Sequence, residues 1–100
     1  MTIKSPFMPT RGANQVVTPA ATSASVSVNP SAKSVRFVNS GTNICYVRMG
    51  QSPQTATTAD TPVLPNSAII LQKQMDDNTV AYISAAGTTL NIQTGEGGYV

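Results

Sequence analysis

The stretch from Lys33 to Gly50 has the clearest pattern of apolar and polar positions in the chain. Two runs rich in β-branched, aromatic and apolar residues, Ser34–Val38 and Ile44–Met49, flank a polar segment, Asn39–Asn43. Asn and Gly in that segment tolerate positive φ, and its hydroxyl groups can bond to nearby backbone. The pattern predicts a β-hairpin.

The register of this predicted hairpin follows from its side chains. A three-residue loop, Ser40–Thr42, places Val35 opposite Val47 and Phe37 opposite Cys45, so that one face is wholly apolar. A two-residue turn would give both faces a mixed character, and a slip of one residue moves every side chain to the other face. We therefore expect the three-residue loop, with these four side chains in the core.

The same register predicts a second hairpin face. It pairs Arg36 with Tyr46, which allows a cation–π contact, and Val38 with Ile44. A solvated face should be polar by alternation, so we expect a second sheet or a neighbouring subunit to cover this one. The alternative is a sandwich with one imperfectly polar outer face. The candidate partner-binding residues on this face are Arg36, Val38, Ile44, Tyr46 and Arg48.

Further strands are expected on both sides of the predicted hairpin. Ala24–Val28 alternates between small or apolar residues and serine, which predicts a half-buried strand. The Ile-Ile-Leu run inside Ser67–Lys73 predicts burial on both faces of that strand, and Thr79–Ala85 and Thr89–Thr94 complete the set. No segment has a helical period. The chain is therefore predicted to be all-β, with six or so short strands in a small antiparallel β-sandwich or barrel.

Residues 1–21 differ from the rest because prolines and a glycine interrupt every possible regular element. We expect an extended N-terminal arm at 1–21, followed by a β-sandwich domain at 22–100 with a short Gly-rich C-terminal tail. The arm could pack along its own domain or across a neighbouring subunit, and we favour the neighbour because short terminal segments bury little against one small domain. The candidate partner-binding residues are Ile3, Phe7, Met8, Arg11, Val16 and Val17 in the arm, and Tyr99 and Val100 in the tail.

Composition favours a protein that is packed among others. Only 10% of the 100 residues are charged, and the net charge is +2. A surface of this kind suits a subunit of a larger assembly, although a simple small domain would look similar. The basic residues are scattered and have no aromatic partners for stacking, so we expect no nucleic-acid binding.

No part of the sequence points to a membrane. No apolar run approaches the length of a membrane span, and the first fifteen residues lack the apolar core of a signal peptide. We therefore expect synthesis and folding in a reducing cytoplasm, with no membrane partner.

The residues available for catalysis are few. The chain has no histidine, and its one cysteine, Cys45, lies on the predicted core face. Asp76, Asp77 and Asn78 could contribute to a calcium site, but their spacing matches no EF-hand, and aspartate is frequent in plain turns. We expect no catalytic residues, no metal site, no cofactor and no enzymatic activity.

Several segments together resemble small virion proteins of tailed bacteriophages. They are VRFVNSGTNICYVRMG, a Thr/Ala-rich loop, TPVLPNSAIIL and TVAYISAAGTTLNIQTGEGG, which together cover about Lys33 to Gly98. The chain is most similar to capsid decoration, or cement, proteins. That resemblance implies a β-sandwich or jelly-roll-like body and an arm that clasps neighbouring subunits.

The function that this resemblance implies is structural. The expected role is to bind the outer capsid surface and to staple neighbouring subunits of the major capsid protein. The chain is expected to be a homo-oligomer on the particle. Alternatives are a tail, baseplate or fibre component, or a carbohydrate-binding module for receptor recognition. The chain has few aromatic residues from which to build a stacking platform for sugars.

Overall fold

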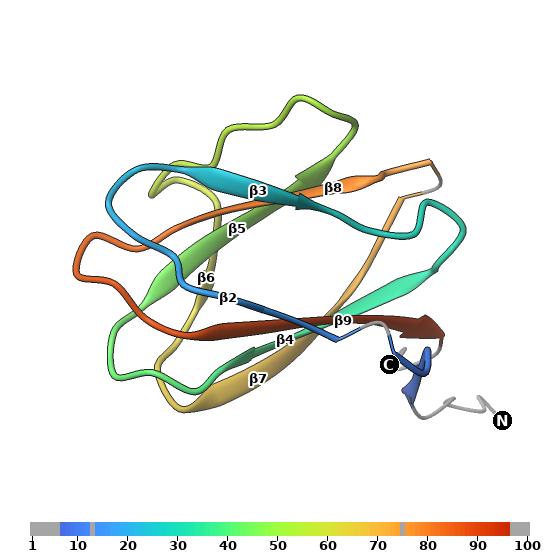
Figure 1. The fold of residues 1–100 in the computed structure, drawn as a ribbon, viewed down its shortest axis with the longest axis horizontal. Helices are drawn as coiled ribbons and strands as arrows, with labels where there is room; N and C mark the ends of the chain where they lie inside the picture. The colour runs from blue at the N-terminus through green and yellow to red at the C-terminus, as the bar shows by residue number, and fades with distance from the viewer. Residues whose placement is uncertain (1–6, 13, 75, 97–100) are drawn as a thin grey trace, which may run out of the picture.

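The computed structural model describes residues 7–12, 14–74 and 76–96, which form two stacked antiparallel sheets (Figure 1). No helix occurs among these residues. The five strands of sheet A are β1 (Met8–Pro9), β2 (Gln15–Val17), β4 (Ser34–Asn39), β7 (Ser67–Gln72) and β9 (Leu90–Glu96). The four strands of sheet B are β3 (Ala24–Ser27), β5 (Cys45–Gly50), β6 (Thr61–Val63) and β8 (Thr79–Ile83).

The strand order is that of a jelly roll. Sheet A runs β1-β9-β4-β7, with β2 pairing with a second part of β9, and sheet B runs β3-β8-β5-β6. When β1 and β2 are taken as one interrupted strand, eight strands remain, and every connection between them changes sheet except β5–β6. The predicted all-β, jelly-roll-like sandwich is confirmed.

The predicted hairpin between β4 and β5 is wrong. β4 pairs with β7 and β9 in sheet A, whereas β5 pairs with β6 and β8 in sheet B. The polar segment between them is therefore an arch that crosses from one sheet to the other. Alternation identifies which side chains point to the core, but two strands on opposite sides of one core have the same pattern as two neighbours in a sheet.

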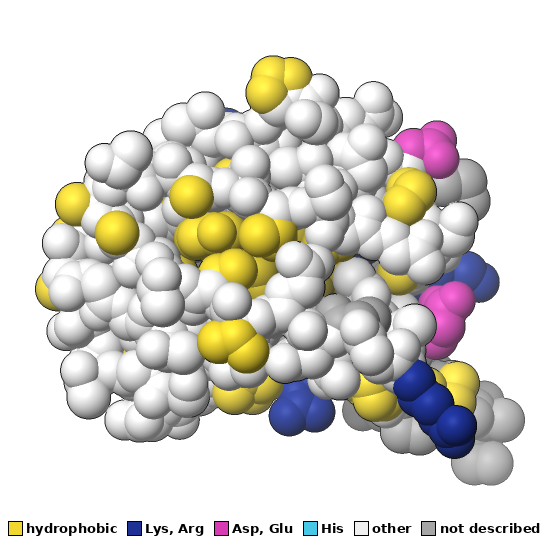
Figure 2. Space-filling model, viewed as in Figure 1, with side chains coloured by type: hydrophobic (Ala, Val, Ile, Leu, Met, Phe, Trp, Pro, Cys, Tyr) yellow, Lys and Arg dark blue, Asp and Glu magenta, His cyan; other side chains and the backbone are white. Residues whose placement is uncertain are grey.

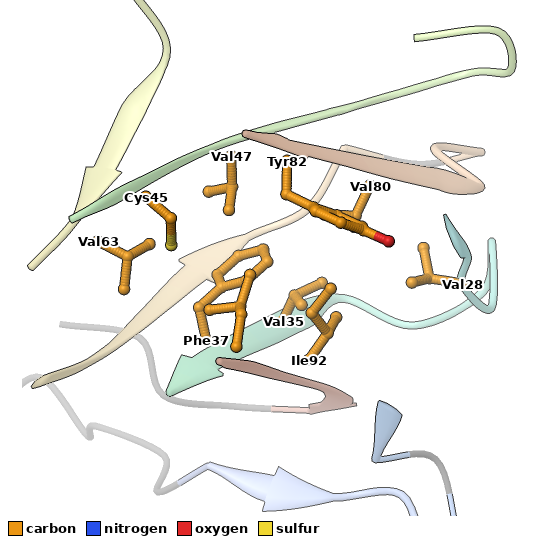
Figure 3. Close-up of a cluster of buried hydrophobic side chains, with 10 residues drawn as sticks. Val28, Val35, Phe37, Cys45, Val47, Val63, Val80, Tyr82 and Ile92 are labelled. Atoms are coloured by element: carbon orange, nitrogen blue, oxygen red, sulfur yellow. The ribbon is translucent and has the colours of Figure 1, made fainter. Parts of the chain in front are cut away.

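The four residues predicted for the core are nevertheless all buried. Val35, Phe37 and Cys45 are fully inaccessible to solvent, and Val47 is 2% exposed. Figure 3 shows that Cys45 and Val47 of sheet B point toward Phe37 of sheet A. Val63, Val80, Leu90 and Ile92 are also fully buried. The pairs expected side by side therefore face each other across the sandwich.

The described part of the predicted arm belongs to sheet A. Met8 and Pro9 pair with Glu96 and Gly95, and Gln15–Val17 pairs with the start of β9. Strand pairing in sheet A therefore begins at Met8, within the segment expected to be an arm. The preference for a neighbouring subunit does not hold for these residues, since β9 of the same chain supplies the edge to which their backbone binds.

One further strand prediction needs correction, and one short strand was not predicted. β7 alternates between half-buried and exposed residues, with Ile70 38% exposed, so the expected burial on both of its faces is wrong. The cause is the two-layer architecture, in which only the inner face of a strand meets the core, and β7 also lies at the end of the strand order, so that Ile69 and Leu71 on its inner face are only half-buried. β6 has no strand signal in the sequence, because it is short and two of its three residues are exposed, and it pairs with β5.

One buried amide joins the loops at the end of the sandwich where the arch crosses. Asn39 is fully buried, and its Nδ2 donates to the carbonyl oxygens of Asn43, at 2.8 Å, and Val63, at 3.0 Å. Its Oδ1 accepts hydrogen bonds from the Gly41 N–H, at 3.1 Å, and the Thr88 hydroxyl, at 2.7 Å. Asn39 thereby connects β4, the arch, β6 and the loop between β8 and β9.

Replacing Asn39 with Ala should lower the free energy of unfolding by about 3 kcal/mol, because it leaves buried donors and acceptors without partners. Chemical denaturation followed by circular dichroism measures this loss. Asn91→Ala is the matched control, since the amide of Asn91 makes only a solvent-exposed hydrogen bond with Asn14 and should cost no more than about 0.5 kcal/mol. Equal losses in the two variants would contradict the role given to Asn39.

Candidate interaction surfaces

The predicted hairpin face is divided between the two outer faces of the sandwich. Arg36 and Val38 lie on the outer face of sheet A, whereas Tyr46 and Arg48 lie on that of sheet B. Ile44 lies in the arch and accepts a hydrogen bond from the Ser84 hydroxyl through its carbonyl oxygen, at 2.7 Å. The expected cation–π contact between Arg36 and Tyr46 is therefore wrong, because the whole core separates them.

The outer face of sheet A is open and almost uncharged. One row across it consists of Val16, Asn91, Val38 and Ala68, and the next contains Gln93, Arg36 and Ile70. Val16 is 63% exposed. Among the strand residues described on this face, Arg36 is the only charged one. This surface combines exposed aliphatic side chains with neutral polar ones.

The outer face of sheet B is partly covered by the loop at residues 51–60. The Arg48 guanidinium on β5 donates to the Thr55 carbonyl oxygen, at 3.2 Å, and pairs with Asp60, also at 3.2 Å. On the other side, the Ala56 N–H donates to the Ser23 hydroxyl, at 2.8 Å, just before β3. Since β8 lies between β3 and β5, these contacts hold the loop across β8.

The burial of two alanines agrees with the position of the loop over β8. Ala81 of β8 points to the outer side of sheet B and is fully buried, and Ala56 in the loop is 2% exposed. The Thr/Ala-rich loop of the sequence is therefore present at residues 51–60, and it packs against sheet B. Arg48 is therefore engaged within its own chain, whereas Arg36 and Val38 are not covered in this way.

Most of the predicted arm residues lie along sheet A. Phe7 packs on its own domain, since its ring would lie 2.9 Å from a Cβ placed on Gly95. Val17 is half-buried against the core, whereas Met8 is 60% exposed and Arg11 is exposed. Ile3, Tyr99 and Val100 lie outside the described residues. The arm candidates are therefore brought to one edge of sheet A, but they do not form a single cluster.

An apolar patch is visible on the side of the sandwich shown in Figure 2, between β3 and the edge formed by β2 and β9. Val17 and Val26 are half-buried residues of these strands that pack against the core. The Gln15 side chain bridges the same gap by donating to the Ser27 carbonyl oxygen, at 2.8 Å. Little charge is seen over most of this view.

A buried lysine occupies the opposite end of the sandwich. Lys73 is 5% exposed, and its Nζ donates to the carbonyl oxygens of Pro30, Gln74 and Asp77 at 2.7–3.1 Å. An ammonium group has three N–H donors, and all three are used here. A cavity of about 450 Å³ beside it, lined by residues that include Lys33 and Asp76, has no aromatic lining residue and receives no free donor from Lys73.

The candidate calcium residues Asp76, Asp77 and Asn78 lie in the loop that supplies carbonyl oxygens to this lysine. Asp76 has a φ of 71° and is exposed, and the Asp77 N–H donates to the Gln74 carbonyl oxygen, at 3.2 Å, as in a turn. Two of the carbonyl oxygens in this loop bind Lys73 instead of facing a metal ion. Among the described residues, no three Asp, Glu, Cys or His side chains come close enough together to hold a metal.

Cys45 is suited to packing. Burial raises the pKa of its thiol from 9.0 to about 11, so the thiol is neutral at physiological pH. Its sulfur lies 3.8 Å from Nδ2 of Asn39. The thiol therefore acts as a small apolar side chain inside the core.

Several important positions had only weak signals in the sequence. The exposed Ala68 and Ile70 belong to an apolar run that predicts burial on both faces of the strand. An apolar run of this length also fits a strand with one exposed face, in which Ile69 and Leu71 point to the core. Asn39 and Lys73 resembled ordinary loop and surface residues. Their buried roles depend on partners distant in the sequence.

Comparisons with models of protein families, with curated proteins and with solved structures found no match. None of the described residues belongs to a helix that could cross a membrane.

Arg48→Met should free the loop at residues 51–60, because the loop loses its ion pair and a carbonyl contact on the β5 side. We expect faster hydrogen exchange at the Ala56 amide, with a change in stability of no more than about 1 kcal/mol because the pair is partly exposed. Arg36→Met is the control, since Arg36 lies on the other sheet. Unchanged exchange at Ala56 would show that the loop does not depend on Arg48.

Raising the pH should destabilise the protein through Cys45. The folded state holds the thiol proton up to about pH 11, whereas the unfolded chain releases it near pH 9.0. The contribution is therefore complete below pH 9.0 and is lost as the pH rises toward 11, with a total of roughly 2–3 kcal/mol. Denaturation of the native protein and of Cys45→Ala at several pH values measures the difference.

This comparison is needed because burial also raises the pKa of Tyr82, which contributes in the same direction. Cys45→Ala retains the Tyr82 effect and should lose only the Cys45 part. Parallel stability curves for the two proteins between pH 9 and 11 would contradict the expectation.

Proposed function

We propose that this chain is a non-enzymatic structural protein of a tailed-bacteriophage virion. In this proposal it binds the outer surface of the capsid and staples neighbouring subunits of the major capsid protein. The observation that carries the proposal is the outer face of sheet A, which is open, rich in exposed aliphatic side chains, and has one charged residue among its described strand positions.

Such a face is suited to contact with another protein. Burying Val16, Val38 and Ala68 removes apolar surface from water, which is favourable, while few charges need to be desolvated. The neutral side chains of Asn91 and Gln93 can form hydrogen bonds around them. The outer face of sheet B has less surface available for a partner, because the loop at residues 51–60 already covers part of it.

The first described residues lie at the rim of this same face. Phe7 packs against Gly95, beside Ser34 at the end of β4. Residues that bind a neighbour on the particle could therefore include both the face and the N-terminal segment. The jelly-roll strand order is compatible with this role, although this architecture serves many functions.

The proposal is tested by the presence of the chain in virions and by its binding to them. Mass spectrometry and electron microscopy of particles from the phage that encodes it should find many copies on the capsid exterior. Val38→Lys, combined with Val16→Lys, should reduce capsid occupancy at least about tenfold, because it buries two unpaired charges. Leu64→Lys is the matched control, since Leu64 is 58% exposed in the turn between β6 and β7.

The same experiment separates the other roles. Copies confined to the tail would replace capsid decoration with a tail, baseplate or fibre role. Absence from particles, together with binding of the isolated protein to host glycans, would favour receptor recognition. Full occupancy by the double variant would show that the outer face of sheet A does not contact the capsid.

A further inference from the structure

The outer edge of β7 has unpaired backbone groups. β7 pairs with β4 on one side, and no other described strand pairs with it. The Lys73 N–H donates to the Lys33 carbonyl oxygen, at 2.8 Å, immediately after the strand. Alternation then directs the backbone groups of Leu71 and Ile69 toward β4, and those of Gln72, Ile70 and Ala68 toward the open edge.

The hydrogen bonds between β4 and β9 support this assignment of the backbone groups of β7. The Ser40 N–H donates to the Thr89 carbonyl oxygen, at 3.0 Å, so the even-numbered residues of β4 bond to β9. The odd-numbered residues of β4 then bond to β7, at positions that include the Phe37–Ile69 pair. Three consecutive outward peptide positions, centred on Ile70, are thus available for another strand.

The edge is complementary to itself. If a second copy approaches antiparallel with Ile70 opposite Ile70, each Ala68 lies opposite a Gln72, and the outward N–H and C=O groups of both strands meet. The side chains match on both faces as well. Ile70 meets Ile70 on the outer face, and Ile69 meets Leu71 on the inner face, where both residues are only half-buried in one chain.

The strand lacks the devices that usually prevent such pairing. Natural edge strands are often blocked by proline, by a bulge, or by a charged side chain that would meet its own copy. β7 contains none of these within Ser67–Gln72. The nearest charge, on Lys73, is held inside its own chain by three carbonyl oxygens. With a net charge of +2 per chain, long-range repulsion between two copies is weak.

We infer that two copies of this chain associate through β7, antiparallel and centred on Ile70, so that their A sheets join into one continuous sheet. The association is independent of virion binding and is a property of the protein in solution. It also places the outer faces of both A sheets on the same side, which doubles the open surface.

The test is sedimentation equilibrium of the full chain over about a hundredfold range of concentration, together with amide hydrogen exchange. A monomer–dimer equilibrium is expected, with the amides of Ala68, Ile70 and Gln72 gaining protection as the concentration rises. The amides of Ile69 and Leu71 bond to β4 and serve as an internal control, since they should be protected at every concentration.

Two variants test the register. Ile70→Pro removes one outward N–H and should leave the pairing with β4 intact, because an edge strand tolerates proline where its N–H faces solvent. Ile70→Lys places two like charges opposite each other. Each should weaken association at least about tenfold while circular dichroism remains native, and Val16→Lys, at the opposite edge of sheet A, should not.

Other outcomes would overturn the inference. A monomer at every concentration, with freely exchanging amides at positions 68, 70 and 72, would show that the edge stays unpaired. A dimer that survives both Ile70 variants would place the contact elsewhere, for example on an N-terminal segment. Heterologous growth into long fibres would show that β7 meets a different edge instead of its own copy.

Discussion

The burial of one carboxamide, that of Asn39, is the interaction on which the crossing end of the sandwich depends. A jelly roll changes sheet at nearly every connection, so its loops must span the core thickness and still satisfy their backbone groups. Asn39 contributes two donors and one doubly accepting oxygen at the point where β4 leaves sheet A. Asn39 belongs to sheet A, and one of its partners is the Val63 carbonyl oxygen of sheet B, so the amide links the two sheets directly, which apolar packing alone does not do.

The loops around Asn39 need close approach as well as hydrogen bonds. A Cβ on Gly41 would collide with the side chain of Thr88 and would lie 2.9 Å from the backbone nitrogen of Thr89. The same two loops are joined by the Asn43 amide, which donates to the Gly87 carbonyl oxygen at 2.8 Å. Glycine and asparagine in the arch therefore serve tertiary contacts, whereas in the sequence they look like the residues of a local turn.

This difference explains how far the sequence could predict the fold. Burial of Val35, Phe37, Cys45 and Val47 follows from alternation, because side-chain direction is a local property of a strand. Which strands pair with each other is a non-local property, and the short polar segment after β4 is compatible with a hairpin and with an arch. The all-β class was therefore predictable, and the pairing of β4 with β9 was not.

The same limit applies to the surfaces. Arg36 and Tyr46 are predicted to share one face because both alternate with core residues. Alternation gives the direction of a side chain but does not show which sheet its strand joins. The burial of Lys73 has no signal in the sequence, because the three carbonyl oxygens that surround its ammonium group come from two separate loops.

The two outer faces differ because only one connection stays within its sheet. The β5–β6 connection is free to fold back over sheet B, and it does so through Arg48 and Ala56. The connections at the edges of sheet A lead across the core and leave its outer face without a comparable cover. Topology thus decides which face is left open, and the chain has placed its exposed aliphatic residues Val16 and Ile70 on that face. Burial of these side chains against another protein would remove apolar surface from water, which is the physical basis of the capsid contact proposed for this face.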